Sequence, residues 1–173
     1  MEGASKGEGL GNKFLSHIRE VDAIVHMLRC FDSEKIQNVN NSVDPSRDLE
    51  IIDTEMKLAD LESIQKRLDK KNKKNITDTQ VKILTEAQKI IDNGDEITNL
   101  KEIFDKKDLK MSGLLSIKDR LFVCNVDEKS ISTGNKYTNK FLEQYNDSDT
   151  IIISADIENQ INQLEEKEKE NYL

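Results

Sequence analysis

The chain has 173 residues, a net charge of −8, and 35% each of hydrophobic and charged residues. That length suits one domain with an insertion, and the acidic balance argues against nucleic-acid binding over the whole surface. No apolar run approaches the roughly 20 residues that a membrane span needs, and the N-terminus lacks the apolar core of a signal peptide, so we expect a cytoplasmic location and no membrane contact.

Residues 1–43 are predicted to form a loop, a helix and a strand. The glycine-rich stretch 3–11 indicates a mobile loop. An apolar stripe predicts a helix over 12–19. The mostly apolar, β-branched run 21–31 predicts a strand that is buried on both faces.

Residues 44–115 are predicted to form a helical insertion built on a two-helix, coiled-coil hairpin. Asp44-Pro45 is typical of a helix start, and the helix should run to about residue 71. Thr77-x-x-Gln80 is a capping-box signature for the second helix. Lysines at the tip of the hairpin are candidates for contact with a polyanion. They are Lys70, Lys71, Lys73 and Lys74.

Residues 116–173 contain two more short apolar strands, predicted at 121–124 and 150–153. Aromatic side chains at every fourth position from Tyr137 mark one face of a helix between them. Strands that alternate with helices predict a parallel sheet with flanking helices. The sequence therefore favours an α/β fold that the helical insertion interrupts.

Candidates for catalysis or metal binding are few. Cys30 and Cys124 each close an apolar run, so we expect two reduced, buried thiols. No Cys/His spacing is typical of zinc, and His17 and His26 have no carboxylate or cysteine neighbours at ligand spacing. We identify no catalytic residue and no metal ligand.

Polar motifs directly follow two strands, at Asn125-Val126-Asp127-Glu128 and at Ser154-Ala155. Ligands of parallel sheets bind beyond the carboxyl ends of the strands. The first motif is similar to the Asn-Lys-x-Asp turn of guanine-nucleotide proteins, in which the Asp carboxylate accepts two parallel donors from guanine. Here Glu128 takes the place of that Asp and Val126 that of the Lys, so we expect a weakened guanine clamp and tolerance of adenine. The alternative interpretation is an ordinary polar turn.

Taken in order, many segments resemble the Obg-like ATPases of the YchF family. They are Gly3–Leu15, His17–Glu20, Asp22–Ile24, Arg29–Phe31, Val43–Pro45, Arg47–Asp48, Ala59–Glu62, Val123–Glu128 and Ser154–Ala155. The resemblance implies a P-loop NTPase G-domain that is split by a coiled-coil insertion and followed by a TGS domain. It also implies hydrolysis of ATP in preference to GTP, with Mg²⁺, and association with ribosomes or RNA.

By the same resemblance, each candidate site residue acquires a role. Asn125 and the backbone of Val126 would contact adenine, and Glu128 would mark the altered specificity. Ser154 and Ala155 would line the base pocket.

The chain departs from the family pattern at both ends. The Walker A loop, switch I and Asp-x-x-Gly motif are expected before Gly3 and the TGS domain after Leu173, and the sequence contains none of these motifs. We therefore expect weak base binding and no hydrolysis by this chain alone. The missing half of the G-domain and the TGS domain are the expected partners.

Three functions stay open at this point. The first is a fragment of a YchF-type ATPase, the second is a standalone helical module that binds ribosome or RNA without nucleotide chemistry, and the third is a GTPase. A sheet without its neighbouring strands would also expose an edge and apolar surface, so we expect self-association or aggregation.

Overall fold

The computed structural model describes residues 9–33, 42–69, 73–145 and 149–164. These residues form two compact units. The helical unit comprises the described residues of Met1–Ile24 and Glu50–Asp119, and the sheet unit comprises those of Val25–Leu49 and Arg120–Leu173. The three-part division at residues 43 and 115 stays a prediction.

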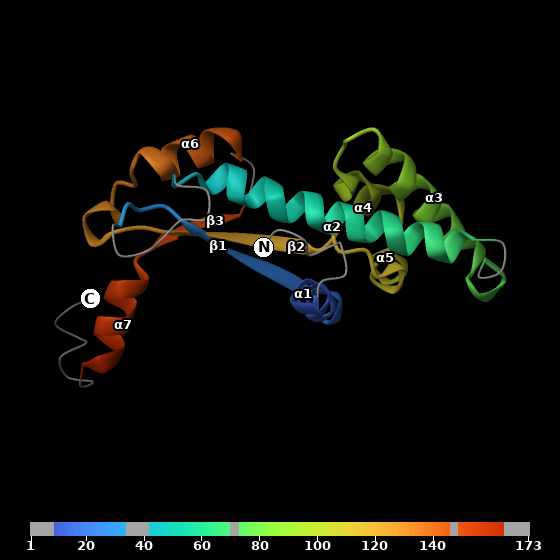
Figure 1. The fold of residues 1–173 in the computed structure, drawn as a ribbon, viewed down its shortest axis with the longest axis horizontal. Coiled ribbons are helices and arrows are strands. Elements are labelled where there is room, and N and C mark those ends of the chain that lie inside the picture. Colours follow the sequence, from blue (N-terminus) through green and yellow to red (C-terminus); the bar gives the residue numbers. More distant parts are fainter. Residues whose placement is uncertain (1–8, 34–41, 70–72, 146–148, 165–173) are drawn as a thin grey trace. The chain divides into compact units, whose positions relative to one another are not determined.

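Figure 1 labels the helices and strands in chain order. In order they are α1 (Gly9–Glu20), β1 (Ala23–Arg29), α2 (Pro45–Leu68), α3 (Asp78–Asp92), α4 (Leu100–Ile103), α5 (Lys106–Ser112), β2 (Asp119–Asn125), α6 (Lys136–Gln144), β3 (Thr150–Ile153) and α7 (Ala155–Gln163). Short 3-10 helices are η1 (Lys73–Asn75), η2 (Ile97–Asn99) and η3 (Glu128–Ser130).

The loop predicted over residues 3–11 is wrong where it can be compared. Residues 1–8 lie outside the described residues, but Gly9–Gly11 form the first turn of α1. Glycine in a helix costs only about 1 kcal/mol relative to alanine, so the amphipathic helix can begin within a glycine-rich stretch.

The sheet has the strand order β1-β2-β3. β2 and β3 are parallel, with Phe122 opposite Thr150 and Asn125 opposite Ile153. The N–H of Cys30, just after β1, donates to the carbonyl of Asn125 at 2.8 Å. The α/β fold predicted from the sequence is confirmed, and the helical segment between β1 and β2 interrupts the sheet as expected.

One face of the sheet is covered by α6 and by Leu49 in the first part of α2. Phe141 of α6 is 0% exposed and packs with the buried side chains of this face. Its ring meets Phe122 edge-on at 5.5 Å between centroids and stacks on Tyr145 at 4.7 Å. Both cysteines, Cys30 and Cys124, are free and buried here, as predicted.

The opposite face of the sheet is open at its edges. Val25 and Met27 of β1 are each 59% exposed, and Ile151 of β3 is 46% exposed. Side chains alternate between faces along a strand, so these residues point away from the covered face. The prediction that the run 21–31, which contains β1, is buried on both faces is therefore wrong.

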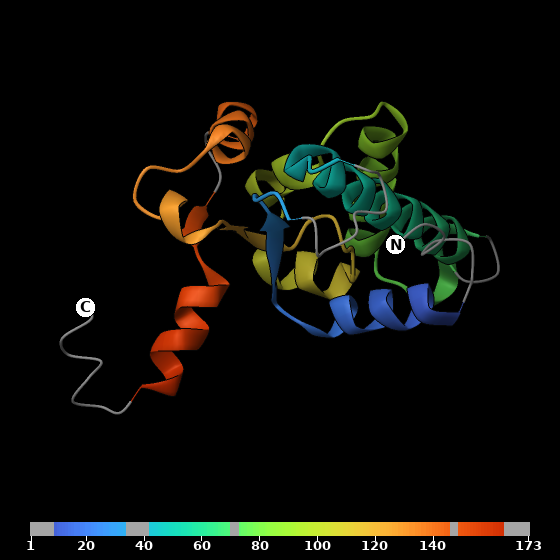
Figure 2. The ribbon, with the colours of Figure 1, turned by 60° about the vertical axis from the view of Figure 1, so that its left-hand side comes forward.

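The helical unit closes around its own apolar core. Side chains from α2, α3, η2, α4 and α5, and from the segment before β2, form the largest cluster. Figures 1 and 2 show α3 and α4 running beside the second half of α2. Thr77 caps α3 by accepting from the N–H of Gln80 at 3.2 Å. The reciprocal half of the predicted capping box does not form, because the Gln80 side-chain oxygen accepts from Arg67 at 3.4 Å and its NH₂ donates to the carbonyl of Asp108 at 2.8 Å.

Asp60 of α2 anchors this unit from inside. It is 0% exposed, and its carboxylate accepts from the N–H groups of Leu115 at 2.8 and 3.0 Å and of Ser116 at 2.9 Å. Burial raises the pKa of Asp60, and these backbone donors oppose that rise. The carboxylate thus ties the long helix to the segment that leads into β2.

The polyanion lysines can be placed only in part. Lys70 and Lys71 lie outside the described residues, Lys73 is in η1, and Lys74 is exposed. Across the described ranges, no helix combines the length and apolar character that crossing a bilayer requires.

Candidate base-recognition site

β2 and β3 end side by side, and their polar motifs meet there. The N–H of Val126 donates to the carbonyl of Ile153 at 2.8 Å, which extends the pairing by one residue. The side-chain oxygen of Asn125 accepts from the N–H of Ala155 at 2.9 Å. The predicted meeting of the Asn125 and Ser154-Ala155 motifs at one end of the sheet is thus observed.

The bond to Ala155 decides which donors this end of the sheet can offer a ligand. It occupies the Asn125 oxygen and the Ala155 N–H, and it leaves the Asn125 side-chain NH₂ with no partner among the described residues. The first intrahelical bond of α7 is donated by Glu158 to Ser154, so the N–H groups of Asp156 and Ile157 have no helical acceptor. The available donors are therefore an amide NH₂ and a helix N-terminus.

Ser154 brings a buried hydroxyl to the same place. The residue is 2% exposed, and its Oγ has no hydrogen-bond partner within the residues that the structure describes. Ser154 precedes α7 without capping it through its side chain. A buried hydroxyl without a partner costs about 1–3 kcal/mol, so a bound molecule that supplied one would be stabilised.

In the loop after β2, the two acidic side chains have different surroundings. Asp127 accepts a hydrogen bond from the Ser130 hydroxyl and closes the turn of η3. Glu128 is exposed, and no hydrogen bond or ion pair to its carboxylate is found in the described part of the chain. Val126 is 3% exposed and packs into the sheet core, so only its backbone can face a ligand.

Asn135 supports this end of the sheet, and the sequence reasoning missed it. Its side chain caps α6 by accepting from Tyr137 N at 2.9 Å and Thr138 N at 3.2 Å. Its NH₂ donates to the carbonyl of Cys30 at 2.7 Å. The Asn-x-x-Thr spacing is a capping signal, but its long-range bond to Cys30 has no local signature.

Gly134 allows the sharp turn before this cap. Its φ of +69° lies in the left-handed region, and an added Cβ would come within 2.5 Å of the Thr138 hydroxyl.

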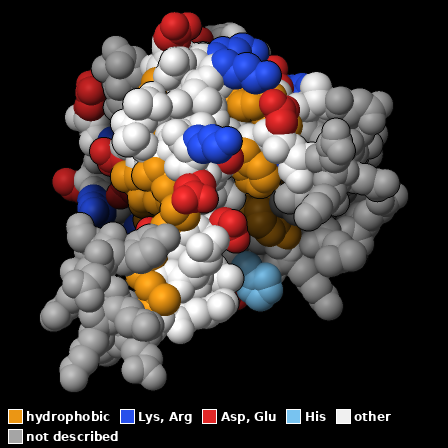
Figure 3. All heavy atoms as spheres, turned by 90° about the vertical axis from the view of Figure 1, so that its left-hand side faces the viewer, with side chains coloured by type: hydrophobic (Ala, Val, Ile, Leu, Met, Phe, Trp, Pro, Cys, Tyr) orange, Lys and Arg blue, Asp and Glu red, His pale blue; other side chains and the backbone are white. Residues whose placement is uncertain are grey.

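Figure 3 views the end of Figure 1 at which β2 and β3 finish, and shows hydrophobic side chains interspersed with acidic ones.

These groups are chemically able to pair with a purine base. An amide NH₂, helix N–H groups and a carboxylate match the acceptors and donors on a purine edge. No group of three or more potential metal-ligating side chains occurs among the described residues, so we derive no position for Mg²⁺ here.

Comparison with known proteins finds relatives among the YchF proteins. It is 38% identical over its full length to the ribosome-binding ATPase YchF of Mycoplasma pneumoniae and 37% identical to that of Bacillus subtilis. Obg-like ATPase 1 of Saccharomyces cerevisiae is 34% identical across 99% of the chain. These alignments cover 51%, 50% and 48% of the relatives.

A solved structure gives the same result. The YchF GTPase of Schizosaccharomyces pombe superimposes with a TM-score of 0.68 and 30% identity over 99% of this chain and 50% of its own. No family model matches the sequence. The chain spans about half the length of the curated relatives that it matches. Over its full length, the chain is therefore similar in sequence and structure to about half of a YchF-type Obg-like ATPase.

Proposed function

We propose that this chain supplies the base-recognition part of a YchF-type protein that binds and hydrolyses ATP in preference to GTP, in the cytoplasm and in association with ribosomes. The observation that carries the proposal is the bond between Asn125 and Ala155, which joins the two loops expected to hold the base. The names of the relatives support the wider activity, because they describe ribosome-binding ATPases.

The proposed roles follow from the groups that stay available. The Asn125 NH₂ donates to N7 of the purine, and the Asp156 N–H and the Ser154 hydroxyl meet the exocyclic edge. Val126 contributes its backbone, and Ala155 positions Asn125. Mg²⁺, when bound, would neutralise the phosphate oxygens of the nucleotide.

Glu128 carries the proposed preference for adenine. A carboxylate that pairs with guanine must present both oxygens to two parallel donors, which depends on side-chain length. Glu128 is one methylene longer than the Asp of the guanine motif and begins a 3-10 turn with its side chain exposed. We therefore expect Glu128→Asp to raise the affinity for guanosine relative to adenosine, as measured by NMR titration of the two nucleosides.

The base contact can be tested on this chain with adenosine, which needs no phosphate site. We expect shifts of the Val126 and Asp156 amides in ¹⁵N spectra, with a dissociation constant of roughly 1 mM. The Asn125→Asp variant keeps an oxygen for the Ala155 N–H but removes the donor to N7. It should abolish these shifts while it leaves the spectrum of the free chain largely unchanged.

The matched control is Asn139→Asp, which makes the same chemical change at an exposed position of α6. It should leave adenosine binding as it is. Equal binding by wild type and Asn125→Asp would refute the base-recognition proposal, as would equal losses in the two variants.

A second candidate function is ribosome or RNA binding by the helical unit without nucleotide chemistry. The names of the relatives and the exposed Lys74 favour it. Replacing Lys70, Lys71, Lys73 and Lys74 by Glu should then abolish co-sedimentation with ribosomes, and ATP should have no effect. Co-sedimentation that survives the four substitutions would exclude this tip as the contact.

A GTPase stays the third candidate, because the solved relative is named a GTPase. Competition between adenosine and guanosine for the same amides distinguishes it from the leading proposal. Guanosine that binds more tightly than adenosine would favour the GTPase.

A further inference from the structure

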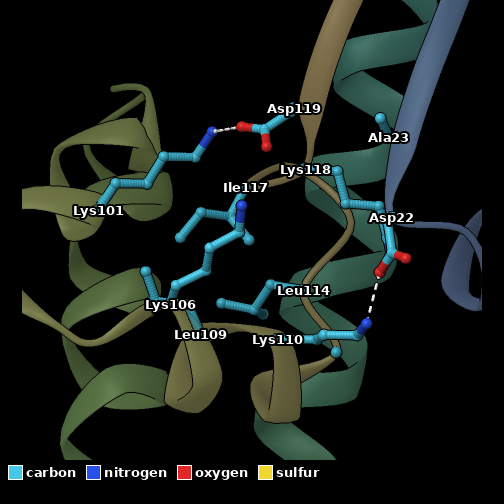
Figure 4. A pocket seen from close by; sticks show the side chains of 11 residues that line it. Asp22, Ala23, Lys101, Lys106, Leu109, Lys110, Leu114, Ile117, Lys118 and Asp119 are labelled. Carbon is cyan, nitrogen blue, oxygen red and sulfur yellow. Dashed lines mark hydrogen bonds and ion pairs between the residues drawn. The ribbon is translucent and has the colours of Figure 1, made fainter.

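A lysine-lined pocket lies in the helical unit, formed by α4, α5, the segment that leads into β2, and the start of β1 (Figure 4). Its volume is about 550 Å³. Pockets that bind small molecules typically measure about 300–1,000 Å³ and combine an apolar lining with a few polar groups. None of the residues predicted from the sequence to bind a ligand lines it.

The rim of this pocket carries more positive than negative charge. Lys101, Lys106, Lys110 and Lys118 line it, together with two aspartates. Lys101 pairs with Asp119 at 2.5 Å, and Lys110 pairs with Asp22 at 2.6 Å. Four lysines against two carboxylates leave an excess of two positive charges around one cavity.

Lys106 and Lys118 carry this excess. Within the described residues no hydrogen bond or ion pair of the Lys106 side chain is found, and Figure 4 shows this side chain extending across the pocket toward Ile117. Lys118 donates only to the backbone carbonyls of Arg19, at 3.2 Å, and Val21. Both partners are uncharged, so neither ammonium is neutralised by a carboxylate bound to it.

The surroundings of Lys118 disfavour its charge further. Burial lowers the pKa of Lys118, and the like charges of Lys110 and Arg19 lower it further, against an opposing effect of Asp22. An anion in the pocket would reverse the balance, because it would offset the repulsion between these cations.

The floor of the pocket is apolar. Leu109, Leu114 and Ile117 line it and belong to the main core of the helical unit, with exposed fractions of 6%, 2% and 6%. An ordinary hydrated anion would leave this floor in contact with water. A ligand with an apolar part would cover the small area of this floor that is still exposed and gain about 25 cal/mol per Å² of apolar surface removed from water.

We propose that this pocket binds a small phosphate monoester whose phosphate meets Lys106 and Lys118 and whose apolar ring or chain lies on Leu109, Leu114 and Ile117. A phosphate dianion matches the two excess positive charges of the rim. The site is separate from the proposed base-recognition site and does not depend on it.

Phenyl phosphate is the probe, and methyl signals of the floor residues in ¹³C spectra of the full chain are the readout. We expect saturable shifts of the Leu109, Leu114 and Ile117 methyls, weaker binding of inorganic phosphate and benzoate, and no binding of phenol. Lys106→Glu should weaken phenyl phosphate binding at least about tenfold, because it replaces a cation by an anion at the rim. Lys106→Gln should give a smaller loss.

Lys107→Glu is the matched control, since it makes the same charge change at the next, exposed residue of α5 outside the pocket lining. Its affinity should stay within about twofold of the wild type. If the methyl signals do not shift at about 10 mM phenyl phosphate, any dissociation constant lies well above the millimolar range. That result would overturn the proposal. Equal losses in Lys106→Glu and Lys107→Glu would also overturn it, because they would indicate non-specific attraction.

Discussion

The helical unit covers its apolar core, whereas the sheet unit covers only one face of its sheet. In the helical unit Ile83, Leu84 and Leu100 are all 0% exposed. In the sheet unit Phe141 is equally buried on one face, while Val25 and Met27 on the other are each 59% exposed. The same apolar residue types thus contribute very differently to stability, because burial and not identity determines the hydrophobic gain.

We expect the largest effect on stability from a substitution on the covered face of the sheet. Phe141→Ala should lower the free energy of unfolding by about 3–5 kcal/mol, because it opens a cavity beside Phe122 and Tyr145. Urea unfolding followed by circular dichroism measures this loss. Met27→Ala is the comparison on the open face and should cost under about 1 kcal/mol. Similar losses in the two variants would show that the open face is covered in solution.

Substitution of Asp60 tests how much its buried carboxylate stabilises the helical unit. Asp60→Asn keeps the shape but turns one acceptor into a donor that faces backbone N–H groups, so we expect a loss of roughly 2 kcal/mol. Glu62→Gln, an equivalent change at an exposed position of the same helix, should be nearly neutral. An Asp60→Asn variant with an unchanged free energy of unfolding would mean that the buried carboxylate does not stabilise the helical unit.

His26 makes the covered face sensitive to acid. Its ring lies 5.5 Å from Phe122, and burial, with a smaller effect of Arg120, lowers its pKa to about 4. The folded state therefore binds a proton less readily than the unfolded state. The contribution of neutral, buried His26 to the free energy of unfolding is complete above pH 6.5 and is lost as pH falls toward 4.

We expect this loss to be about 1 kcal/mol, once solvent screening of the partly exposed ring is allowed for. His26→Gln should remove this loss from the pH dependence of urea midpoints between pH 7 and 4. A His26 resonance that titrates near pH 6.5 in NMR spectra would contradict the prediction.

The smallest effect on stability is expected on the open face, where association should change instead. Wild type should self-associate at high concentration, and Val25→Thr with Met27→Thr should reduce this association in sedimentation velocity. The free energy of unfolding should change by under about 0.5 kcal/mol. Val21→Thr, at an exposed apolar residue outside the strands, is the control. A wild type that stays monomeric at high concentration would contradict the prediction.

Much of the sheet unit could be predicted because its signals are local. The apolar runs around Leu121 and Ile152 predict strands, and parallel strands bring their carboxyl ends together, which places Asn125 beside Ser154. The burial of β1 could not be predicted, since a β-branched run has the same pattern whether one face or both are covered.

Features that depend on distant contacts also escaped prediction. Asp60 looks like any polar residue of an amphipathic helix until Leu115 and Ser116 are brought to it. The lysine pocket combines residues from Asp22 to Asp119, whose spacing in the sequence shows no pattern. Asn135 and Cys30 are likewise joined only by the fold.

The Asn125–Ala155 hydrogen bond should affect both the association rate and the affinity of a purine base at the proposed site. This hydrogen bond joins two segments that lie 30 residues apart in the chain and that we propose to recognise the base. Little conformational entropy then remains to be lost on capture, and the geometry of one segment is transmitted to the other. A substitution that removes the Asn125–Ala155 hydrogen bond should therefore slow the association of the base as well as lower its affinity.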